Sequence, residues 1–279
     1  MKATAHHSDR LRSLIRAGEV RQAIELVASL GLIGVDLSHM DLHGVDLRGA
    51  GLIEADLSHT SLKAASLRGA DLTGAVLRGV DLDGTDLRRV DLTGARLDRV
   101  RLLRTDLREA TLTDIQITRA PCDLQSRWPA GVEIPAGVSL IGEHAQLPGV
   151  DLSGVSLDGY PLQRANLRGA RLVESQLFGA LAHGCNLSRA DLRGATLQSA
   201  RLSRSDLSQA DLTGASLLFT DLSGANLRRA VLADADLSSA RLGRAELRGA
   251  LLSGARFNEY TRWPTGFDPT DPWYGMRKV

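Results

Sequence analysis

Residues 70–74 read Ala-Asp-Leu-Thr-Gly, and residues 210–214 read the same five residues. Leucine stands at the centre of such a motif at every fifth position from residue 32 to 117 and again from residue 152 to 257. The exceptions at the centres are Ile117, Ala182 and Phe257. A period of five fits neither an α-helical turn of about 3.6 residues nor the simple alternation of a strand. Repetition at a fixed period predicts a solenoid.

The motif separates core positions from surface positions. The centre is large and apolar, and the residue two before it is mostly alanine, so we expect both to point inward. The other three positions are polar or glycine, which suits a surface and a turn. Glycine at the fifth position favours a turn with positive φ. Where Arg89, Arg99, Arg104 or Glu109 replaces this glycine, the sequence predicts a different local turn.

These repeats resemble the pentapeptide-repeat family, whose consensus A-[DN]-L-x-x the chain matches over about 200 of its 279 residues. The resemblance implies an all-β solenoid, a right-handed quadrilateral β-helix with four pentapeptides per coil. Each coil would rise by one inter-strand spacing, roughly 4.8 Å. Stability would then be a sum over neighbouring coils. An aromatic content of only 4% fits a core of stacked leucines.

The repeat pattern also divides the chain. The expected segments are an N-terminal helical cap (1–29), a first β-helix module (30–120), an ordered cap and linker (121–149), a second β-helix module (150–260) and a C-terminal cap (261–279). Two short amphipathic helices, at about 8–17 and 19–29 with a hinge at Gly18, would cover the open edge of the first coil.

One signature follows both runs of repeats. Arg-Trp-Pro-x-Gly occupies residues 127–131 and residues 262–266. We expect each tryptophan to cover the core of the last coil, and each proline to prevent further strand pairing. The signature therefore predicts two modules. The segment between them is apolar and keeps the five-residue register, so we expect it to be ordered, with the modules either stacked or bent at a fixed angle.

No residue constellation indicates catalysis. The sequence contains no phosphate-binding glycine loop or nucleophile motif, so the chain is predicted not to be an enzyme and to need no cofactor. His39 and His59 lie twenty residues apart at equivalent positions, but no spacing supplies a third ligand, so no metal site is expected. Cys185 stands in an inward position and is expected to be a buried, inert thiol.

The net charge of +1 shows no bias toward polyanions. Neither direct nucleic-acid binding nor membrane binding is therefore expected. No stretch of eighteen apolar residues is present, and no apolar signal-peptide core follows Lys2. The two cysteines form no spaced set, so a reducing, cytoplasmic location is expected.

Candidate binding residues lie on the outward positions. Arg48, Arg68, Arg88 and Arg108 share one position on four successive coils. One interpretation is a row of surface ion pairs with the aspartates two residues earlier, each worth little. The other is a docking strip for an acidic partner.

A second candidate is apolar. Phe178 and Leu218 share an outward position two coils apart, with Phe219 and Leu181 nearby in sequence. An outward phenylalanine is informative in a chain with so few aromatics. A homodimer, a protein partner, or cover by the linker or a cap would each account for it.

Two functions remain open. The first is a non-catalytic scaffold that binds a protein partner through outward faces of the β-helix. The alternative, which the resemblance implies, is a DNA mimic that protects a type II topoisomerase, DNA gyrase or topoisomerase IV, against quinolone-like poisons or toxins. Residues 30–120 carry 14 acidic and 12 basic residues, and residues 150–260 carry 11 and 13, which argues against a mimic of a densely charged duplex. The first module could still present one acidic face through Asp36, Asp41, Asp46, Asp56, Asp71, Asp81, Asp86 and Asp91.

Overall fold

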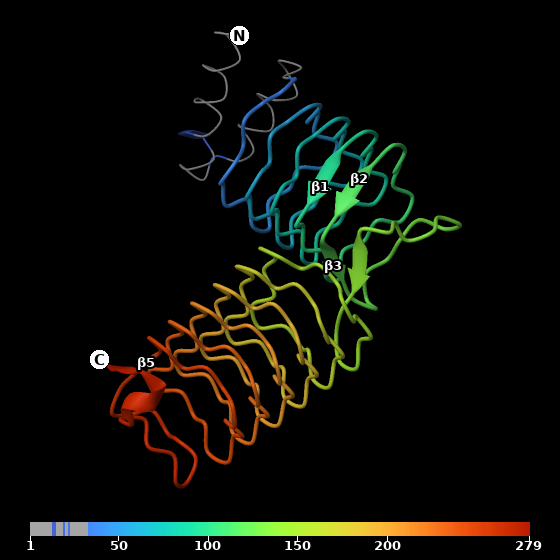
Figure 1. The fold of residues 1–279 in the computed structure, drawn as a ribbon. Helices are drawn as coiled ribbons and strands as arrows, with labels where there is room; N and C mark the ends of the chain where they lie inside the picture. Colours follow the sequence, from blue (N-terminus) through green and yellow to red (C-terminus); the bar gives the residue numbers. More distant parts are fainter. Residues whose placement is uncertain (1–12, 15–18, 20–21, 23–32) are drawn as a thin grey trace. The chain divides into compact units, whose positions relative to one another are not determined.

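The computed structural model describes residues 13–14, 19, 22 and 33–279 (Figure 1). The chain divides into two compact units, unit 1 at residues 1–140 and unit 2 at residues 141–279. Ser13, Leu14 and Gln22 are helical, and Leu14 packs half-buried against the core of unit 1. The rest of the predicted helical cap, with its hinge at Gly18, lies outside the described residues.

The assigned strands are short and all pair in parallel. Strand β1 pairs with β2, β3 with β4, and β5 with β6. Their bounds are Arg96–Asp98 (β1), Gln116–Thr118 (β2), Ala120–Cys122 (β3), Val138–Leu140 (β4), Arg256–Phe257 (β5) and Arg277–Lys278 (β6), and a 3-10 helix, η1, spans Pro272–Tyr274. Elsewhere the coils are joined by isolated parallel bridges, such as Asp36 to Asp56 and Asp191 to Asp211. Bridges twenty residues apart confirm the predicted β-helix of four pentapeptides per coil.

Each pentapeptide repeats one set of backbone hydrogen bonds. The N–H of Leu72 donates to Asp91 O at 2.8 Å, one coil further on. The N–H of Gly74 donates in the same way to Thr93 O at 2.8 Å. The N–H of Ala75 closes the turn on Leu72 O at 3.0 Å. Neighbouring coils therefore satisfy most backbone polar groups of each coil.

The turns accept residues other than glycine at the fifth position. The predicted change of turn is wrong, because φ is 59°, 58°, 52° and 62° at Arg89, Arg99, Arg104 and Glu109. The N–H of Arg89 donates to Arg108 O at 3.1 Å, the same ladder bond that glycines make. A left-handed conformation costs an L-residue about 1 kcal/mol. The ladder bonds on each coil offset this cost, so the turn keeps its shape.

Leucines and small residues fill the core as predicted. Leu72 and Leu212 are at most 1% exposed, and Ala70 and Ala210 are equally buried. Centres twenty residues apart stack on one of four sides, which we number 1 to 4 in chain order around a coil. In unit 2, sides 1 to 4 carry Leu152, Leu157, Leu162 and Leu167 with their equivalents every twenty residues. In unit 1, sides 1 to 4 carry Leu52, Leu57, Leu62 and Leu67 with their equivalents.

Both units end in the same way. Arg127 bridges to Asp106, and Arg262 bridges to Arg241, each 21 rather than 20 residues away. Trp128 then packs half-buried against the core of unit 1, as predicted. In unit 2, Trp263 lies edge-on to Phe257, with ring centroids 5.8 Å apart.

A returning strand follows each tryptophan. In unit 1, β4 pairs with β3, and in unit 2, β6 pairs with β5, so both returns lie along the last coil. Gly137 allows the first return, because a Cβ there would lie 1.9 Å from the carbonyl oxygen of Ile117. The close approach of two backbones therefore requires glycine at this position.

Candidate functional surfaces

The described residues offer little chemistry. Among them, no three His, Cys, Asp or Glu side chains cluster as a metal site requires. The rings of His39 and His59 stack 5.0 Å apart with an interplanar angle of 14°. Burial raises the pKa of the Cys185 thiol to about 12 and that of Cys122 to about 11, so both thiols are protonated and inert at neutral pH.

Asp83 is a buried carboxylate on side 3 of unit 1, only 8% exposed. Burial raises its pKa, and the charge of Arg101 opposes that rise. Arg101 Nη2 contacts its carboxylate, and the N–H of Leu103 donates to it at 3.2 Å. A carboxylate enclosed by its own ion pair and backbone is a structural group, because no reacting molecule can reach it.

The predicted arginine row lies on side 4 of unit 1 and is largely paired. Arg48, Arg88 and Arg108 each contact the aspartate two residues earlier, at 2.5, 2.6 and 2.7 Å. Arg68 has Ser66 in place of that aspartate and makes no ion pair with any residue that the structure describes. The geometry thus favours a self-neutralised row over a docking strip.

Three predicted apolar candidates, Phe178, Leu218 and Phe219, lie on side 2 of unit 2, whereas Leu181 lies on side 3. Phe178 is 51% exposed and Phe219 is 57% exposed, whereas Leu218 and Leu181 are half-buried. Bridges at twenty-residue spacing run along this side, so Phe178 and Leu218 share one column two coils apart. Phe219 adopts a φ of 57°, in the left-handed region. We call Phe178, Leu218 and Phe219 the phenylalanine patch.

The expected acidic face of unit 1 is wrong as drawn from the sequence. Bridges join Asp36 to Asp56 and Asp71 to Asp91, but these two pairs lie on different sides. Asp41 and Asp81 lie on side 3, and Asp46 and Asp86 on side 4. Aspartates five residues apart occupy successive sides, so the eight carboxylates are spread over all four.

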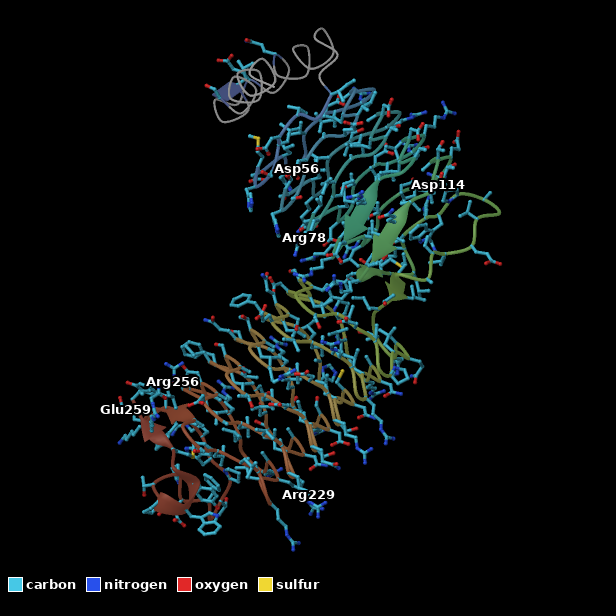
Figure 2. All side chains as sticks on the ribbon, turned by 45° about the horizontal axis from the view of Figure 1, so that its top comes forward. Asp56, Arg78, Asp114, Arg229, Arg256 and Glu259 are labelled. Carbon is cyan, nitrogen blue, oxygen red and sulfur yellow. The ribbon has the colours of Figure 1, made fainter. Side chains whose placement is uncertain are left out.

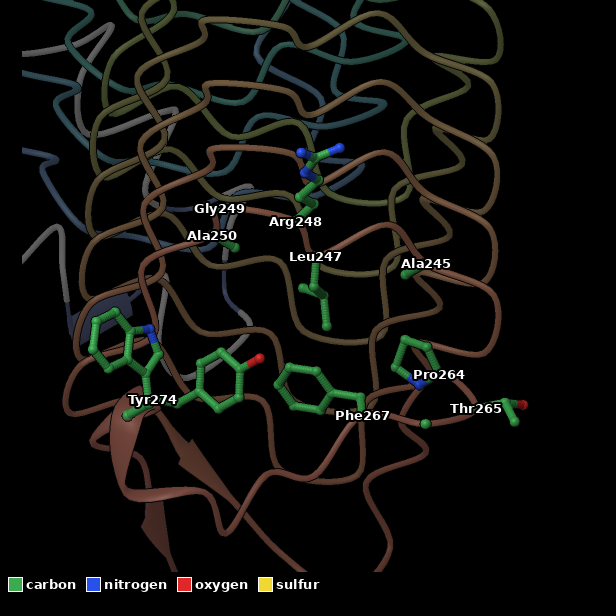
Figure 3. A pocket seen from close by; sticks show the side chains of 11 residues that line it. Ala245, Leu247, Arg248, Gly249, Ala250, Pro264, Thr265, Phe267 and Tyr274 are labelled. Atoms are coloured by element: carbon green, nitrogen blue, oxygen red, sulfur yellow. The ribbon is translucent and has the colours of Figure 1, made fainter.

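An open hollow of about 420 Å³ lies at the C-terminal cap of unit 2 (Figure 3). Its lining includes Leu247, Phe267, Trp273 and Tyr274. The rings of Phe267 and Tyr274 lie 4.8 Å apart below Leu247, and Trp273 is 89% exposed. Arg248 is the one charged residue among those that line it.

Sequence reasoning missed a strongly basic surface of unit 2. Arginines gather on its sides 3 and 4, whereas most of its carboxylates lie on sides 1 and 2. Charges counted per module conceal this segregation. Counting residues twenty apart would have found it, because such residues stack on one side of a β-helix.

Comparison with known proteins agrees with this architecture. The sequence model of the family described as pentapeptide repeats matches the chain in eight copies, over residues 32–69, 50–89, 85–120, 162–198, 190–229 and 230–259. A comparison with curated protein sequences gave no match.

Similar solved structures are pentapeptide repeat proteins and a resistance protein. One is HetL, a pentapeptide repeat protein involved in heterocyst differentiation regulation from the cyanobacterium Nostoc sp. strain PCC 7120. HetL is 32% identical to this chain, the match covers 80% of this chain and 87% of HetL, and the TM-score is 0.31. A pentapeptide repeat protein from the thylakoid lumen of Arabidopsis thaliana is 30% identical, with 41% of this chain and 66% of that protein covered and a TM-score of 0.18. QnrB1, a plasmid-mediated fluoroquinolone resistance protein, is 15% identical to this chain. The match covers 86% of this chain and 90% of QnrB1, and the TM-score is 0.33.

In the part of the chain that the structure describes, no helix has both the length and the apolar character needed to cross a bilayer.

Proposed function

Because the chain belongs to the pentapeptide-repeat family, whose members form right-handed quadrilateral β-helices, we propose that it is a non-catalytic scaffold that binds a protein partner. The observation that carries this proposal is the phenylalanine patch. Phe178 and Phe219 are both more than half exposed, although the chain has only four phenylalanines. Aromatic side chains are enriched at the centres of protein interfaces, where they supply much of the binding energy.

Photo-cross-linking tests this proposal in cells that produce the protein. A photo-reactive residue at Gln198, in the column between Phe178 and Leu218, is expected to capture one discrete protein. The matched control is the same residue at Ser208, which occupies the equivalent outward position on side 4 and is also half-buried. Phe178→Asp should abolish the capture at Gln198. Equal capture at both positions would contradict the proposal, and capture of a second copy would identify a homodimer.

Topoisomerase protection is the second candidate, and one observation favours it. Side 1 of unit 1 carries Glu54, Asp71, Asp91 and Asp114 and no lysine or arginine among its described residues. These four carboxylates span three coil steps, roughly 14 Å. A duplex carries about one charge per 1.7 Å, or about eight over that length. The side therefore has half the charge density of DNA. Restored supercoiling by gyrase in the presence of a quinolone would support this candidate over the scaffold.

The cytoplasmic location remains a prediction. So do the five-segment division of the chain and the role of Arg48, Arg68, Arg88 and Arg108 in binding.

A further inference from the structure

Sides 3 and 4 of unit 2 form a basic surface. Between residues 161 and 250 they carry ten arginines and three carboxylates, Asp206, Asp221 and Glu246. The arginines are Arg164, Arg168, Arg189, Arg201, Arg204, Arg228, Arg229, Arg241, Arg244 and Arg248. We call these ten the arginine surface. All ten side chains belong to exposed residues.

The arginine surface is largely unneutralised. Arg228 pairs with Glu246 at 2.7 Å, and the other nine make no ion pair with any described residue. The carboxylate of Asp206 accepts hydrogen bonds from Ser208 N and Asn226 Nδ2, both at 3.0 Å. This differs from unit 1, where the aspartate two residues earlier holds most arginines of the corresponding row.

Glycines help to arrange the surface into a row. Arg164, Arg204 and Arg244 alternate with Gly184 and Gly224 at one position of side 3. A Cβ at Gly184 would lie 3.5 Å from Arg164 Cγ, and one at Gly224 would lie 3.7 Å from Arg204 Cγ. Each arginine stem therefore extends over the glycine of the next coil, which spaces the guanidiniums two coils apart, roughly 10 Å.

A row at the edge of side 4 repeats this arrangement. A Cβ at Gly249 would lie 3.4 Å from Arg229 Cγ, so the stem of Arg229 also extends over the glycine one coil further on. Figure 2 shows the Arg229 side chain extending away from the coils. The charged ends are thus presented outward on both sides.

We propose that the arginine surface binds the phosphate backbone of a nucleic-acid duplex without reading its sequence. Ten arginines less three carboxylates leave a net charge of seven over four coil steps. Those steps span roughly 19 Å, so the surface carries about one net positive charge per 3 Å. A duplex carries about one negative charge per 1.7 Å. The two charge densities are of the same order and of opposite sign.

The composition of the surface favours a duplex over a protein or a single strand. The exposed large apolar residues of the described chain include none on sides 3 and 4 between residues 161 and 250. Protein interfaces have a core depleted of charge and enriched in aromatics. Protein–DNA interfaces are more polar and much more positive. Single strands are held by stacking on aromatic side chains, and sides 3 and 4 carry none between residues 161 and 250. Arg248, at the C-terminal end of the surface, lies beside the aromatic rings that line the hollow.

This inference goes beyond the scaffold function and does not depend on it, because the phenylalanine patch lies on side 2. It also departs from the expectation drawn from net charge. The net charge of +1 is the sum of a basic surface and of carboxylates that lie on other sides. A partner that meets one face responds to the local field rather than to the sum.

Fluorescence anisotropy of a labelled duplex, titrated with the full chain between about 50 and 200 mM salt, tests the proposal. The unmodified chain is expected to bind two duplexes of unrelated sequence equally, and to lose affinity steeply as salt rises. The triple variant Arg164→Gln, Arg204→Gln, Arg244→Gln is expected to lower the slope of log affinity against log salt by about three, one for each lost phosphate contact.

The matched control is Arg48→Gln, Arg88→Gln, Arg108→Gln in unit 1. It removes the same charge, but from arginines that are already paired, so the slope should not change. Absence of salt-dependent binding by the unmodified chain would overturn the proposal. An equal decrease of the salt slope in both triple variants would also overturn the proposal. Tighter binding of a polyglutamate peptide than of the duplex would overturn it in favour of an acidic protein as the partner. Unchanged melting temperatures exclude unfolding as the cause of a loss.

Discussion

At the scale of single residues, the inward small position decides which substitutions the repeat tolerates. It accepts serine and threonine because their hydroxyls reach a backbone carbonyl of the preceding coil. Thr85 Oγ1 donates to Leu62 O at 2.7 Å, and Ser205 Oγ donates to Ala182 O at 2.7 Å. A buried hydroxyl with a partner is tolerated, whereas a charge without one is not. Serine and threonine are therefore the usual polar residues at this position, although the longer Tyr160 also occupies it and is 2% exposed.

Leu207→Arg is expected to unfold unit 2, because Leu207 is fully buried and a guanidinium there would have no partner. The expected cost is several kcal/mol, comparable to the stability of a whole domain. Circular dichroism melting is the measurement, with Ser208→Arg on the neighbouring outward position as the control. An unchanged melting curve for Leu207→Arg would contradict the inward orientation of the repeat centres.

At the scale of elements, the cap of each unit depends on a strand that returns to the last coil. The pairing of β4 with β3 protects backbone groups that would otherwise form an open sheet edge. An open edge of a solenoid can pair with another chain. The returning strand and the covering tryptophan therefore limit the length of the solenoid.

Gly137→Ala is expected to destabilise unit 1 by about 1–3 kcal/mol, as overpacking does, because the new Cβ would meet the Ile117 carbonyl oxygen at 1.9 Å. Gly51→Ala is the control, since a Cβ there meets nothing within 4 Å and the backbone is not in the left-handed region. Denaturant melts of both variants would show the difference. Equal stability of the two variants would mean that β4 does not lie against the coil.

At the scale of the whole molecule, stability is the sum of many similar coils and of the ion pairs on their surface. Arginines two residues further on lower the pKa of four carboxyls, those of Asp46, Asp86, Asp106 and Asp191. Burial raises the pKa of Asp83 instead. The four lowered groups stabilise the fold above the unfolded pKa of about 3.9, and this contribution is lost as pH falls through the lowered values. The contribution of Asp83 to stability depends on pH in the opposite direction, because its pKa is raised, and it is lost as the pH rises.

The molecule is therefore expected to lose stability as the pH falls below about 4, because the carboxyls with a lowered pKa outnumber Asp83, whose pKa is raised. Melting temperatures between neutral and acid pH measure this loss. In the double variant Asp86→Asn, Asp106→Asn, the melting temperature should fall less steeply with decreasing pH than in the unmodified chain. An equally steep limb would mean that these pairs contribute nothing measurable, as is common for exposed ion pairs.

The sequence by itself determined the coil. Leucine at every fifth residue and a small residue two before it predict the core, and the Arg-Trp-Pro-x-Gly signature predicts the covering role of Trp128. The twenty-residue coil is what the resemblance to pentapeptide-repeat proteins implies. The turns were mispredicted at positions such as Arg89, since ladder bonds between coils override local φ preference. Only the tertiary structure decided which of the charged side chains are neutralised by an ion pair. Arg88 pairs with Asp86, two residues earlier, whereas Arg204 makes no ion pair with any described residue, because pairing depends on whether a carboxylate lies within reach rather than on composition.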